Sequence, residues 1–584
     1  MRGDLSGAAN RRGTALFVSR DRSLVLTDPI ETVCASALRE VLSSLDQVQH
    51  AVDQCGMIAA GYIAYEAGPA FDAAIRAHGP EGDLPLLWFA FYERAQEYRT
   101  LHFTASDYEV GDWNPRVARD DYLKAVRRIR DYIASGDVYQ VNYTFPLEAS
   151  FQGDTLSWFH RLVGAQRADY AAFLNMGRYH VLSASPELFF LLDGDRLTTK
   201  PMKGTRPRGR WLEEDRRMAA DLAASEKDRA ENVMIVDLVR NDVGRVAAPG
   251  SVRVARLFDV ERYPTVWQMT STIEADTDAP VPRVFEALFP PGSVTGAPKV
   301  RMTEIAKDLE PYPRGVYCGT VGWWFPNRRA QFNVAIRTVL VDTSEHRARY
   351  GVGGGITWDS SPETEYEECR VKAGLLTCVH PEFDLLESIL FDGGYFLLDE
   401  HLARLEASAE YFDIPLDRSA VRRVLDAAAE GFERQQRRLK VRLLVSKDGL
   451  VRIEAEPAPA VRPVRVGLAK TRVDPSEVFL FHKTTHRKTY QEALDTRPDC
   501  DDVILMNSRG EITETATANL VLDMEGRLLT PRQECGLLPG TFRTRLLSEG
   551  VIEEAVLRSD DLRRARAVWL INSVRKWVPA IIAE

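Results

Sequence analysis

The sequence predicts an α+β protein made of two unlike halves. Short apolar runs of strand length recur between residues 15 and 92, 170 and 200, and 317 and 356, and stretches with helical periodicity separate them. Strands that pair across such long separations, with helices inserted between them, are typical of one large α+β unit. A new strand, turn and helix pattern starts after residue 384.

The first hundred residues are expected to form an antiparallel sheet with one helix. The apolar runs Ala15–Val18, Ile58–Tyr65 and Leu86–Tyr92 have the length of strands, and a helical stretch covers 31–53. A second helix is predicted over 120–135, where apolar side chains recur on one face, namely Tyr122, Val126, Ile129 and Ile133.

The rest of the first half mixes strands and helices. Mainly helical structure is expected over 214–245, with further helices near 281–288 and 297–309 and a closing helix at 362–378. The expected strands are Val138–Leu147, Ala171–Asn175, Leu188–Leu192, 317–325, 330–341 and 349–356.

A domain boundary is expected between residues 378 and 384, where Pro381 breaks the pattern. The strand Leu385–Leu390, the turn Gly393-Gly394 and the helix Asp399–Phe412 then open a second unit. Because the halves share no motif, two domains are predicted: 1–378, with 1–112 as its N-terminal subregion, and 383–584.

Composition narrows the function classes. The 584 residues suffice for two to four domains, and a net charge of −10 disfavours broad binding to nucleic acid or membrane surfaces. Seven cysteines without a CxxC pair suggest neither a disulfide framework nor a zinc site. The basic N-terminal segment lacks an apolar core, and the run Met57–Ala64 is too short to span a bilayer, so a cytosolic location is expected.

Two acidic segments are candidates for a metal site. Glu231 shares a helix face with Ile235 and Leu238, where an unpaired carboxylate is costly unless a cation compensates it. Glu365 and Glu368 lie three residues apart, with Lys372 four further on. Carboxylates from two helices suit Mg²⁺, which takes few protein ligands and several waters. The alternative for 363–372 is a solvated, ion-paired face.

Lys203, in the segment Pro-Met-Lys-Gly-Thr, is the main candidate for a reactive amine. Gly204 lets the backbone approach a ligand closely. An amine in a partly enclosed place loses its proton more easily and can then attack carbon. The alternative is an ordinary lysine at the end of a strand.

Eight segments of the first half resemble the chorismate-binding enzyme family and occur in family order. They are GDVYQVNYT (136–144), SASPELFF (183–190), PMKGTRPRG (201–209), SEKDRAENVMIVDLVRNDVGR (225–245), FPPGSVTGAPK (289–299), RGVYCGTVGW (314–323), FNVAIRT (332–338) and GVGGGITWDS (351–360). The resemblance implies a two-sheet α/β sandwich with the active site between the sheets. Lys203 points to the aminodeoxychorismate synthase branch, because anthranilate synthases usually have alanine there.

The resemblance also implies a set of binding residues for chorismate, which is a dianion. Glu231 and Glu368 would hold Mg²⁺ on the ring carboxylate, and Lys372 would lie near that carboxylate. Arg337 and Tyr317 would grip the enolpyruvyl carboxylate, since a guanidinium matches a carboxylate with two donors. The remaining substrate-binding residues would be Thr205 and, through backbone N–H groups, Gly353, Gly354 and Gly355.

The implied reaction replaces the C4 hydroxyl of chorismate by an amine. Hydroxide leaves poorly, so a general acid is needed, and Glu187 matches the family's acid. Lys203 matches the nucleophile that adds at C2 before ammonia attacks C4. Gln268 stands where anthranilate synthases have a histidine associated with pyruvate elimination, which supports a product that keeps the enolpyruvyl group. Because no cysteine lies in a glutaminase-like motif, a separate glutamine amidotransferase is the expected ammonia source.

The second half resembles the class IV pyridoxal-phosphate (PLP) enzymes, which include aminotransferases and aminodeoxychorismate lyase. The matching segments are LLESILFDGGYFLLDEHLARLEASAE (385–410), FHKTTHRKTY (481–490), GEITETATANLVL (510–522), GLLPGTFR (536–543) and INSVRK (571–576). The resemblance implies an α+β domain with two subdomains, and such enzymes usually form homodimers.

The cofactor residues implied by this resemblance come from four of these segments. Lys483 would bind PLP covalently, and Glu514 would pair with its pyridine nitrogen, which keeps the ring electron-withdrawing. The phosphate would be held by Arg404, by the backbone N–H groups of Gly540 and Thr541, and by the hydroxyl of Ser573. Thr541 is shifted by one position from the aminotransferase pattern, so its side-chain role stays open.

Together the halves predict a bifunctional enzyme that makes 4-aminobenzoate for folate synthesis. The first half would make 4-amino-4-deoxychorismate, and the second would eliminate pyruvate from it. Three alternatives stay open. The second half could be an amino-acid aminotransferase, the first half an anthranilate synthase, and the N-terminal 110 residues a regulatory module, since relatives bind tryptophan there.

Overall fold

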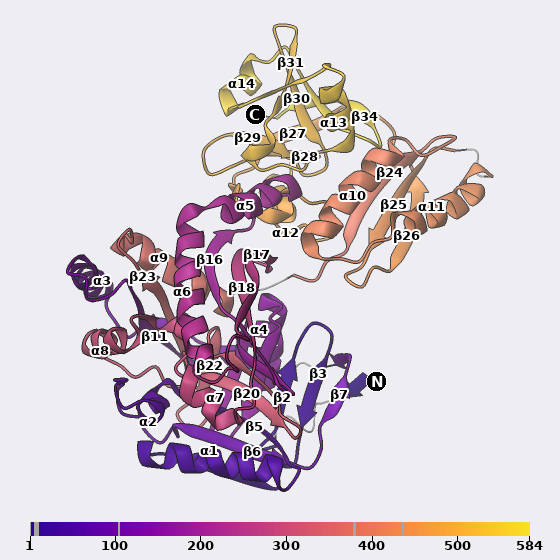
Figure 1. Cartoon of the computed structure of the whole chain (residues 1–584). Coiled ribbons are helices and arrows are strands. Elements are labelled where there is room, and N and C mark those ends of the chain that lie inside the picture. The colour runs from indigo at the N-terminus through magenta and orange to yellow at the C-terminus, as the bar shows by residue number, and fades with distance from the viewer. Residues whose placement is uncertain (1, 5–10, 103–105, 378–380, 435–436, 584) are drawn as a thin grey trace. The chain divides into compact units, whose positions relative to one another are not determined.

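The computed structural model describes residues 2–4, 11–102, 106–377, 381–434 and 437–583. It divides into two compact units (Figure 1). Unit 1 consists of Met1–Pro207 and Ala219–His380, and unit 2 of Arg208–Met218 and Pro381–Glu584. The expected domain boundary includes residues 378–380, which lie outside the described residues. None of the described helices has both the length and the apolar character needed to cross a bilayer.

Unit 1 contains two large, mainly antiparallel sheets. The 11-stranded sheet has the order β10 (Asn114–Pro115), β11 (Gln140–Gly153), β23 (Arg347–Ile356), β22 (Thr338–Asp342), β13 (Tyr179–Ser185), β12 (Tyr170–Asn175), β2 (Ala15–Val18), β3 (Ser23–Leu26) and β7 (Gln96–Tyr98). Two further strands, β9 (Tyr108–Val110) and β19 (Gly296–Ala297), pair with β11.

The 10-stranded sheet has the order β16 (Met202–Pro207), β18 (Val266–Asp276), β15 (Arg196–Lys200), β14 (Leu188–Asp193), β21 (Arg329–Val334), β20 (Thr320–Phe325), β5 (Ile58–Ile63), β6 (Leu87–Tyr92) and β4 (Glu31–Ala35), and β17 (Arg253–Arg262) pairs with β18. A separate pair is formed by β1 (Arg2–Asp4) and β8 (Thr100–His102).

The two sheets face each other across a shared apolar cluster. Phe17 and Leu24 of the first sheet pack there with Tyr62, Trp88 and Trp323 of the second. Because side chains alternate along a strand, the opposite faces of both sheets need cover from helices. This arrangement is the two-sheet sandwich expected from the resemblance.

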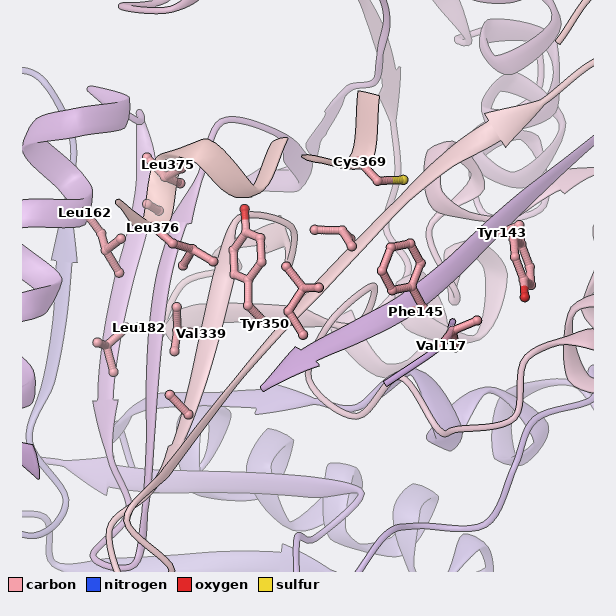
Figure 2. Close-up of a cluster of buried hydrophobic side chains, with 14 of the residues drawn as sticks. Val117, Tyr143, Phe145, Leu162, Leu182, Val339, Tyr350, Cys369, Leu375 and Leu376 are labelled. Atoms are coloured by element: carbon pink, nitrogen blue, oxygen red, sulfur yellow. The ribbon is translucent and has the colours of Figure 1, made fainter. Parts of the chain in front are cut away.

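Helices cover the outer face of each sheet. The 11-stranded sheet packs against α3 (Arg119–Ala134), α4 (Thr155–Gln166), α8 (Lys299–Leu309) and α9 (Pro362–Ala373). Figure 2 shows part of this core, where Phe145 and Tyr350 of the sheet lie near Cys369 of α9. The 10-stranded sheet packs against α1 (Leu38–Asp53), α6 (Glu226–Gly244) and α7 (Val281–Leu288), and α2 (Gly68–Phe71) is a single turn.

Three expected elements differ from the structure. Residues 31–35 form β4, and the helix starts only at Leu38, where Glu40 accepts hydrogen bonds from the N–H groups of Ser36 and Ala37. The run 330–341 is split into β21 and β22, because Arg337 has a φ of 52° and interrupts the extended backbone. The closing helix stops at Ala373 and is followed by one 3₁₀ turn, Gly374–Leu376.

Unit 2 has the two subdomains that the class IV resemblance implies. The smaller has the sheet β24 (Leu385–Phe391), β25 (Leu439–Val445) and β26 (Val451–Pro457), covered by α10 (Leu398–Phe412) and α11 (Arg418–Glu433). The larger has an 8-stranded sheet in the order β29 (Ile512–Thr515), β28 (Asp502–Met506), β27 (Val464–Leu468), β34 (Lys576–Ile582), β33 (Ala567–Asn572), β30 (Asn519–Met524), β31 (Arg527–Pro531) and β32 (Glu553–Ala555). Its helices are α12 (Lys488–Asp495), α13 (Thr541–Ser548) and α14 (Ser559–Arg564).

Unit 2 also includes residues 208–218, which contain the start of α5 (Leu212–Ala224). The buried guanidinium of Arg208 donates to both carboxylate oxygens of Asp215, at 2.6 and 2.8 Å. The hydroxyl of Tyr411 donates to the carbonyl of Gly209. This segment, remote in sequence from the rest of unit 2, was not foreseen from the sequence.

Candidate active sites

A cavity of about 290 Å³ in unit 1 brings together every site residue predicted for the first half. The residues come from β16, α6, β23 and α9 and from the ends of neighbouring strands. They are Glu187, Lys203, Thr205, Glu231, Tyr317, Arg337, Gly353, Gly354, Gly355, Glu368 and Lys372.

Lys203 reaches this cavity from an irregular part of β16. The register of β16 against β18 shifts between Met202 and Thr205, and Gly204 has a φ of 96° that a residue with a Cβ rarely adopts. Burial lowers the pKa of Lys203, and the nearby ammonium of Lys372 acts in the same direction, while Glu231 and Glu368 oppose them. The amine is thus shifted toward the uncharged form that a nucleophile needs.

Glu187 is a buried carboxyl in the loop between β13 and β14, with 3% of its surface exposed. Burial raises its pKa to about 7, although Ser293, the backbone of Met202 and the charge of Lys203 each favour the ionised form. A carboxyl with this pKa is protonated in about half of the molecules at neutral pH, which suits a general acid.

The acidic side of the cavity consists of Glu231 on α6 and Glu365 and Glu368 on α9. Burial raises the pKa of Glu231 and of Glu365. Burial acts on Glu368 in the same way, but Lys372, whose Nζ lies 2.6 Å from its Oε1, lowers its pKa together with Lys203 and Arg337. Lys372 also donates to the carbonyl of Gly353 at 2.8 Å.

These acids fit the proposed magnesium site. Across the described parts of the chain, no group of three or more His, Cys, Asp and Glu side chains is placed to hold a metal together. Mg²⁺ commonly uses only one or two protein carboxylates together with water and substrate oxygens. The carboxylate of Glu231 feels the repulsion of Glu368, and a divalent cation between them would relieve that repulsion.

The same cavity offers groups for a second anion. Arg337 and Tyr317 line it, and Arg337 is fixed by a 2.8 Å hydrogen bond from Nη1 to the carbonyl of Lys372. β22 pairs with β23 only as far as Tyr350, whereas β11 pairs with it through Ile356. Within the described sheet, one edge of Gly351–Ile356 therefore has no strand partner, and its backbone donors can face a ligand.

Gln268, the residue that departs from the anthranilate synthase pattern, also lines the cavity. Its Oε1 accepts a hydrogen bond from the hydroxyl of Thr205 at 3.0 Å. The amide therefore occupies this position without the titratable ring that a histidine would provide.

A larger cavity, of about 550 Å³, lies in unit 2 and is lined by all the predicted cofactor residues. Lys483, Arg404, Glu514, Gly540, Thr541 and Ser573 meet there from both subdomains. Burial and the positive charge of Arg404 lower the pKa of Lys483 to about 8. This value favours the free amine that condenses with an aldehyde.

Glu514 is held rigidly at the wall of this cavity. Its Oε1 accepts hydrogen bonds from the Tyr490 hydroxyl and the Leu538 N–H, and its Oε2 accepts one from the Asn519 amide. Burial nevertheless raises the pKa of Glu514 to about 7. A protonated pyridine nitrogen would provide the missing positive partner, so the acid fits PLP.

The predicted phosphate-binding end has one feature that the sequence did not reveal. Arg404 donates from Nε and Nη2 to Glu387, at 2.9 and 2.6 Å, and His401 lies 2.6 Å from the same carboxylate. Nη1 of Arg404 donates to the carbonyl of Pro539. Part of the guanidinium is therefore already committed to Glu387.

The other phosphate candidates have defined positions. Gly540 is the N-cap of α13 and Thr541 its first residue, so the backbone N–H groups of this helix start point at the cavity wall. The Thr541 hydroxyl lies 3.2 Å from Nε2 of His401. Ser573 donates to the carbonyl of Ser388.

Several residues at the two sites were missed by sequence reasoning. In unit 2 they are Glu387, His401, Tyr490 and Asn519. In unit 1 they are Ser293, which lines the cavity, and Gln140, which lies beside Gly355. Glu387 had a signal, because a carboxylate inside the apolar strand Leu385–Phe391 must find a cationic partner. The sequence held no signal for Gln140 and Asn519, because the role of a buried amide becomes evident only from its neighbours in the fold.

Both halves match known families. Residues 99–377 match the chorismate binding enzymes, and residues 384–581 match amino-transferase class IV. Over 271 residues the chain is 42% identical to aminodeoxychorismate synthase component 1 of Salmonella typhimurium, a match that covers 46% of this chain and 59% of that protein. Over 262 residues it is 41% identical to anthranilate synthase component 1 of Thermus thermophilus, covering 44% of this chain and 56% of that protein.

The chain thus spans little more than half the length of these curated relatives. The fold of the first half is similar to that of anthranilate synthase component I from Streptococcus pneumoniae, with a TM-score of 0.55 and 25% identity. That likeness covers 62% of this chain and 93% of the other.

Proposed function

Because the chain joins a chorismate binding enzyme region to a class IV aminotransferase region, we propose that it is a bifunctional enzyme that forms 4-aminobenzoate for folate synthesis. The first domain, residues 1–378, aminates chorismate to 4-amino-4-deoxychorismate. The second, residues 383–584, eliminates pyruvate from this product. The observation that carries the proposal is the buried Lys203 amine in one cavity with Glu187, Arg337 and the acids of α6 and α9.

In the first site, each residue acts on one part of chorismate. Arg337 and Tyr317 hold the enolpyruvyl carboxylate, with backbone donors of Gly353–Gly355. Mg²⁺, when bound by Glu231 and Glu368, supplies positive charge for the ring carboxylate. Nζ of Lys203 forms a bond to C2, the two ring double bonds shift, and the C4–O bond breaks as Glu187 gives its proton to the leaving oxygen. Ammonia then attacks C4 and the amine of Lys203 departs.

Residue identity at two positions favours amination at C4 over anthranilate formation. Overall identity does not separate the two reactions, because a synthase of each kind is about equally similar to this chain. Lys203 supplies a nucleophile for C2, and Gln268 offers no titrating ring for a later elimination. Both features support a first product that keeps its enolpyruvyl group.

The class IV region implies PLP as the cofactor of the second site. When bound, PLP withdraws electrons from the carbon that carries the substrate amine. Lys483 and Glu514 would hold its ring, and Arg404, Gly540, Thr541 and Ser573 its phosphate. Lys483 would take the proton from ring carbon C4, and the C3–O bond breaks as the ring becomes aromatic. The enolpyruvate that leaves takes up a proton and becomes pyruvate.

A coupled assay tests both halves together. The full chain is incubated with chorismate, an ammonium salt, Mg²⁺ and PLP, and the products are separated by chromatography. The expected product is 4-aminobenzoate, and omission of PLP should leave 4-amino-4-deoxychorismate instead. Anthranilate as the main product would refute the assignment of the first half. Transfer of an amino group from D-alanine or leucine to 2-oxoglutarate, without turnover of 4-amino-4-deoxychorismate, would make the second half an aminotransferase.

The proposal extends to partners. The relatives called component 1 suggest a separate glutamine amidotransferase that delivers ammonia, with free ammonia as its substitute in the assay. A homodimer through the second half and a cytosolic location complete the proposal.

A further inference from the structure

Gln140 carries a buried side-chain amide that forms no hydrogen bond with any described residue. It is the first residue of β11 and has no exposed surface. Within the described residues, neither its Oε1 nor its Nε2 has a hydrogen-bond partner. An unsatisfied buried polar group costs about 1–3 kcal/mol, so an apolar side chain would serve the fold better at this position.

The amide lies next to the amine of Lys203. A Cβ on Gly355 would fall 2.4 Å from Nε2 of Gln140 and 2.4 Å from Nζ of Lys203. The two nitrogens are therefore no more than about 4.8 Å apart. Only a glycine at 355 leaves the space that both groups occupy.

The side-chain amide of Gln140 can form a hydrogen bond with the Lys203 amine whether that amine is charged or uncharged. Since neither Oε1 nor Nε2 is engaged, half a turn of the terminal torsion exchanges them without breaking a hydrogen bond. Oε1 can then accept an N–H from Lys203, which leaves the lone pair of Nζ directed elsewhere. Glu231, Glu365, Glu368 and Lys372, which act electrostatically on this amine, belong to the proposed site for magnesium and the ring carboxylate, and Glu187 is the proposed acid.

We propose that Gln140 is a positioning residue for Lys203, whose side-chain amide holds Nζ over Gly355 and aims its lone pair at C2 of the substrate. The inference rests on the nucleophilic role proposed for Lys203. When the bond from Nζ to C2 forms and the C4–O bond breaks, Nζ becomes a secondary ammonium that keeps both its hydrogens. Oε1 of Gln140 accepts one of them and so stabilises the charge that develops in the transition state.

Replacing Gln140 by methionine tests this role, because it removes both polar atoms and nearly keeps the volume. The full chain is assayed for 4-amino-4-deoxychorismate with ammonia, and its melting temperature is measured. A kcat lower by about 10²-fold is expected, the size of effect that a misplaced reacting group can have. KM for chorismate should not change, and the melting temperature should stay the same or rise.

Tyr65→Phe is the matched control. Among the described residues, the Tyr65 hydroxyl is also buried without a hydrogen-bond partner, but its ring lies 4.4 Å from the guanidinium of Arg314, whereas Gln140 lies beside the amine of Lys203. This variant should keep kcat and should not lose stability. Gly355→Ala supplies a second route, since its Cβ displaces Gln140 or Lys203 from the other side and should also lower kcat.

Two results would overturn the inference. Gln140→Met with unchanged kcat would show that the amide does not guide the amine. A variant that loses melting temperature and kcat together would show a structural role instead. Lys203→Ala is assayed in parallel to separate the two proposals. If Lys203→Ala keeps the wild-type kcat, the nucleophilic role of Lys203 is wrong. If Lys203→Ala is inactive while Gln140→Met is fully active, only the inference about Gln140 is wrong.

Discussion

At the scale of single residues, burial shifts the pKa of the main ionisable groups in both candidate sites. Lys203 and Lys483 are lysines whose pKa is lowered, and Glu187 and Glu514 are carboxyls whose pKa is raised. In each case desolvation is the largest cause. Groups perturbed in this way collect at functional sites.

The raised pKa of Glu187 predicts how the first reaction depends on pH. Because a general acid must carry its proton, kcat should fall as pH rises through about 7, the pKa of Glu187. The measurement is kcat for 4-amino-4-deoxychorismate formation across pH, with the concentration of uncharged ammonia held constant. Glu187→Gln should lower kcat by about 10²–10⁴-fold, the usual contribution of a general acid.

Glu187→Gln is also expected to raise the stability of the protein, although it lowers kcat. The folded-state pKa of Glu187 lies above its ordinary value of 4.5, so its contribution to stability is lost as pH rises through 7. Above pH 7, Glu187→Gln should therefore unfold at a higher temperature than wild type. A flat pH profile of kcat in wild type would rule out Glu187 as the acid.

The sequence located residues whose type is unusual for their position. Lys203 lies between a proline-containing turn and a glycine, and Glu231 lies among apolar residues of a helix, so both could be found without a structure. Gln140 could not, because its significance depends on Gly355 and Lys203, which approach it only in the folded chain. Glu387 was missed because its partners His401 and Arg404 lie on a different element.

At the scale of elements, the periodicity of apolar residues predicted long helices well and short segments less well. The helix over 119–134 begins one residue before its predicted start, because its apolar face fixes it against the sheet. The predicted helix over 31–53 was wrong at its start. Thr32 and Val33 pair with β6, and this tertiary pairing decides the structure of a segment too short to have a clear period.

A buried ion pair connects the end of α8 to β11. We expect a large loss of stability when this pair is broken. Arg314 lies 2.7 Å from Glu310 and donates to the carbonyl of Asn142, while Glu310 accepts from the backbone N–H of Thr144. Both side chains are almost fully buried. Glu310→Ala should reduce the free energy of unfolding by about 3–5 kcal/mol, because it leaves a buried charge unpaired.

Urea denaturation of the purified protein measures this loss. The exposed pair of Arg240 and Asp237 on α6 provides the control, since both side chains are about half exposed. Asp237→Asn should change the free energy of unfolding by less than about 0.5 kcal/mol. A similarly small change in Glu310→Ala would mean that water reaches Arg314.

At the scale of the whole molecule, the two cavities lie in separate units, and each is lined by a buried lysine of lowered pKa. Unit 1 contains Lys203, and unit 2 contains Lys483. The sequence predicts a domain boundary from the change of pattern near Pro381, where unit 2 resumes. It could not show that residues 208–218 belong with unit 2, because that assignment depends on contacts such as the one from Tyr411 to Gly209.

The separation predicts that the two activities can be removed one at a time. Lys483→Ala in the full chain should accumulate 4-amino-4-deoxychorismate and should lose the visible absorbance of covalently bound PLP. Lys203→Ala should form no product from chorismate but should still release pyruvate from supplied 4-amino-4-deoxychorismate. If either substitution abolishes both activities in a folded protein, the sites do not act independently.

Two buried amines of lowered pKa also make the chain vulnerable to the same kind of reagent. PLP is an aldehyde, and an aldehyde condenses with any uncharged amine that it can reach. We therefore expect excess PLP to bind more than one equivalent per chain. The PLP that condenses with Lys203 should inhibit the reaction of chorismate. Chorismate, by filling that cavity first, should protect it.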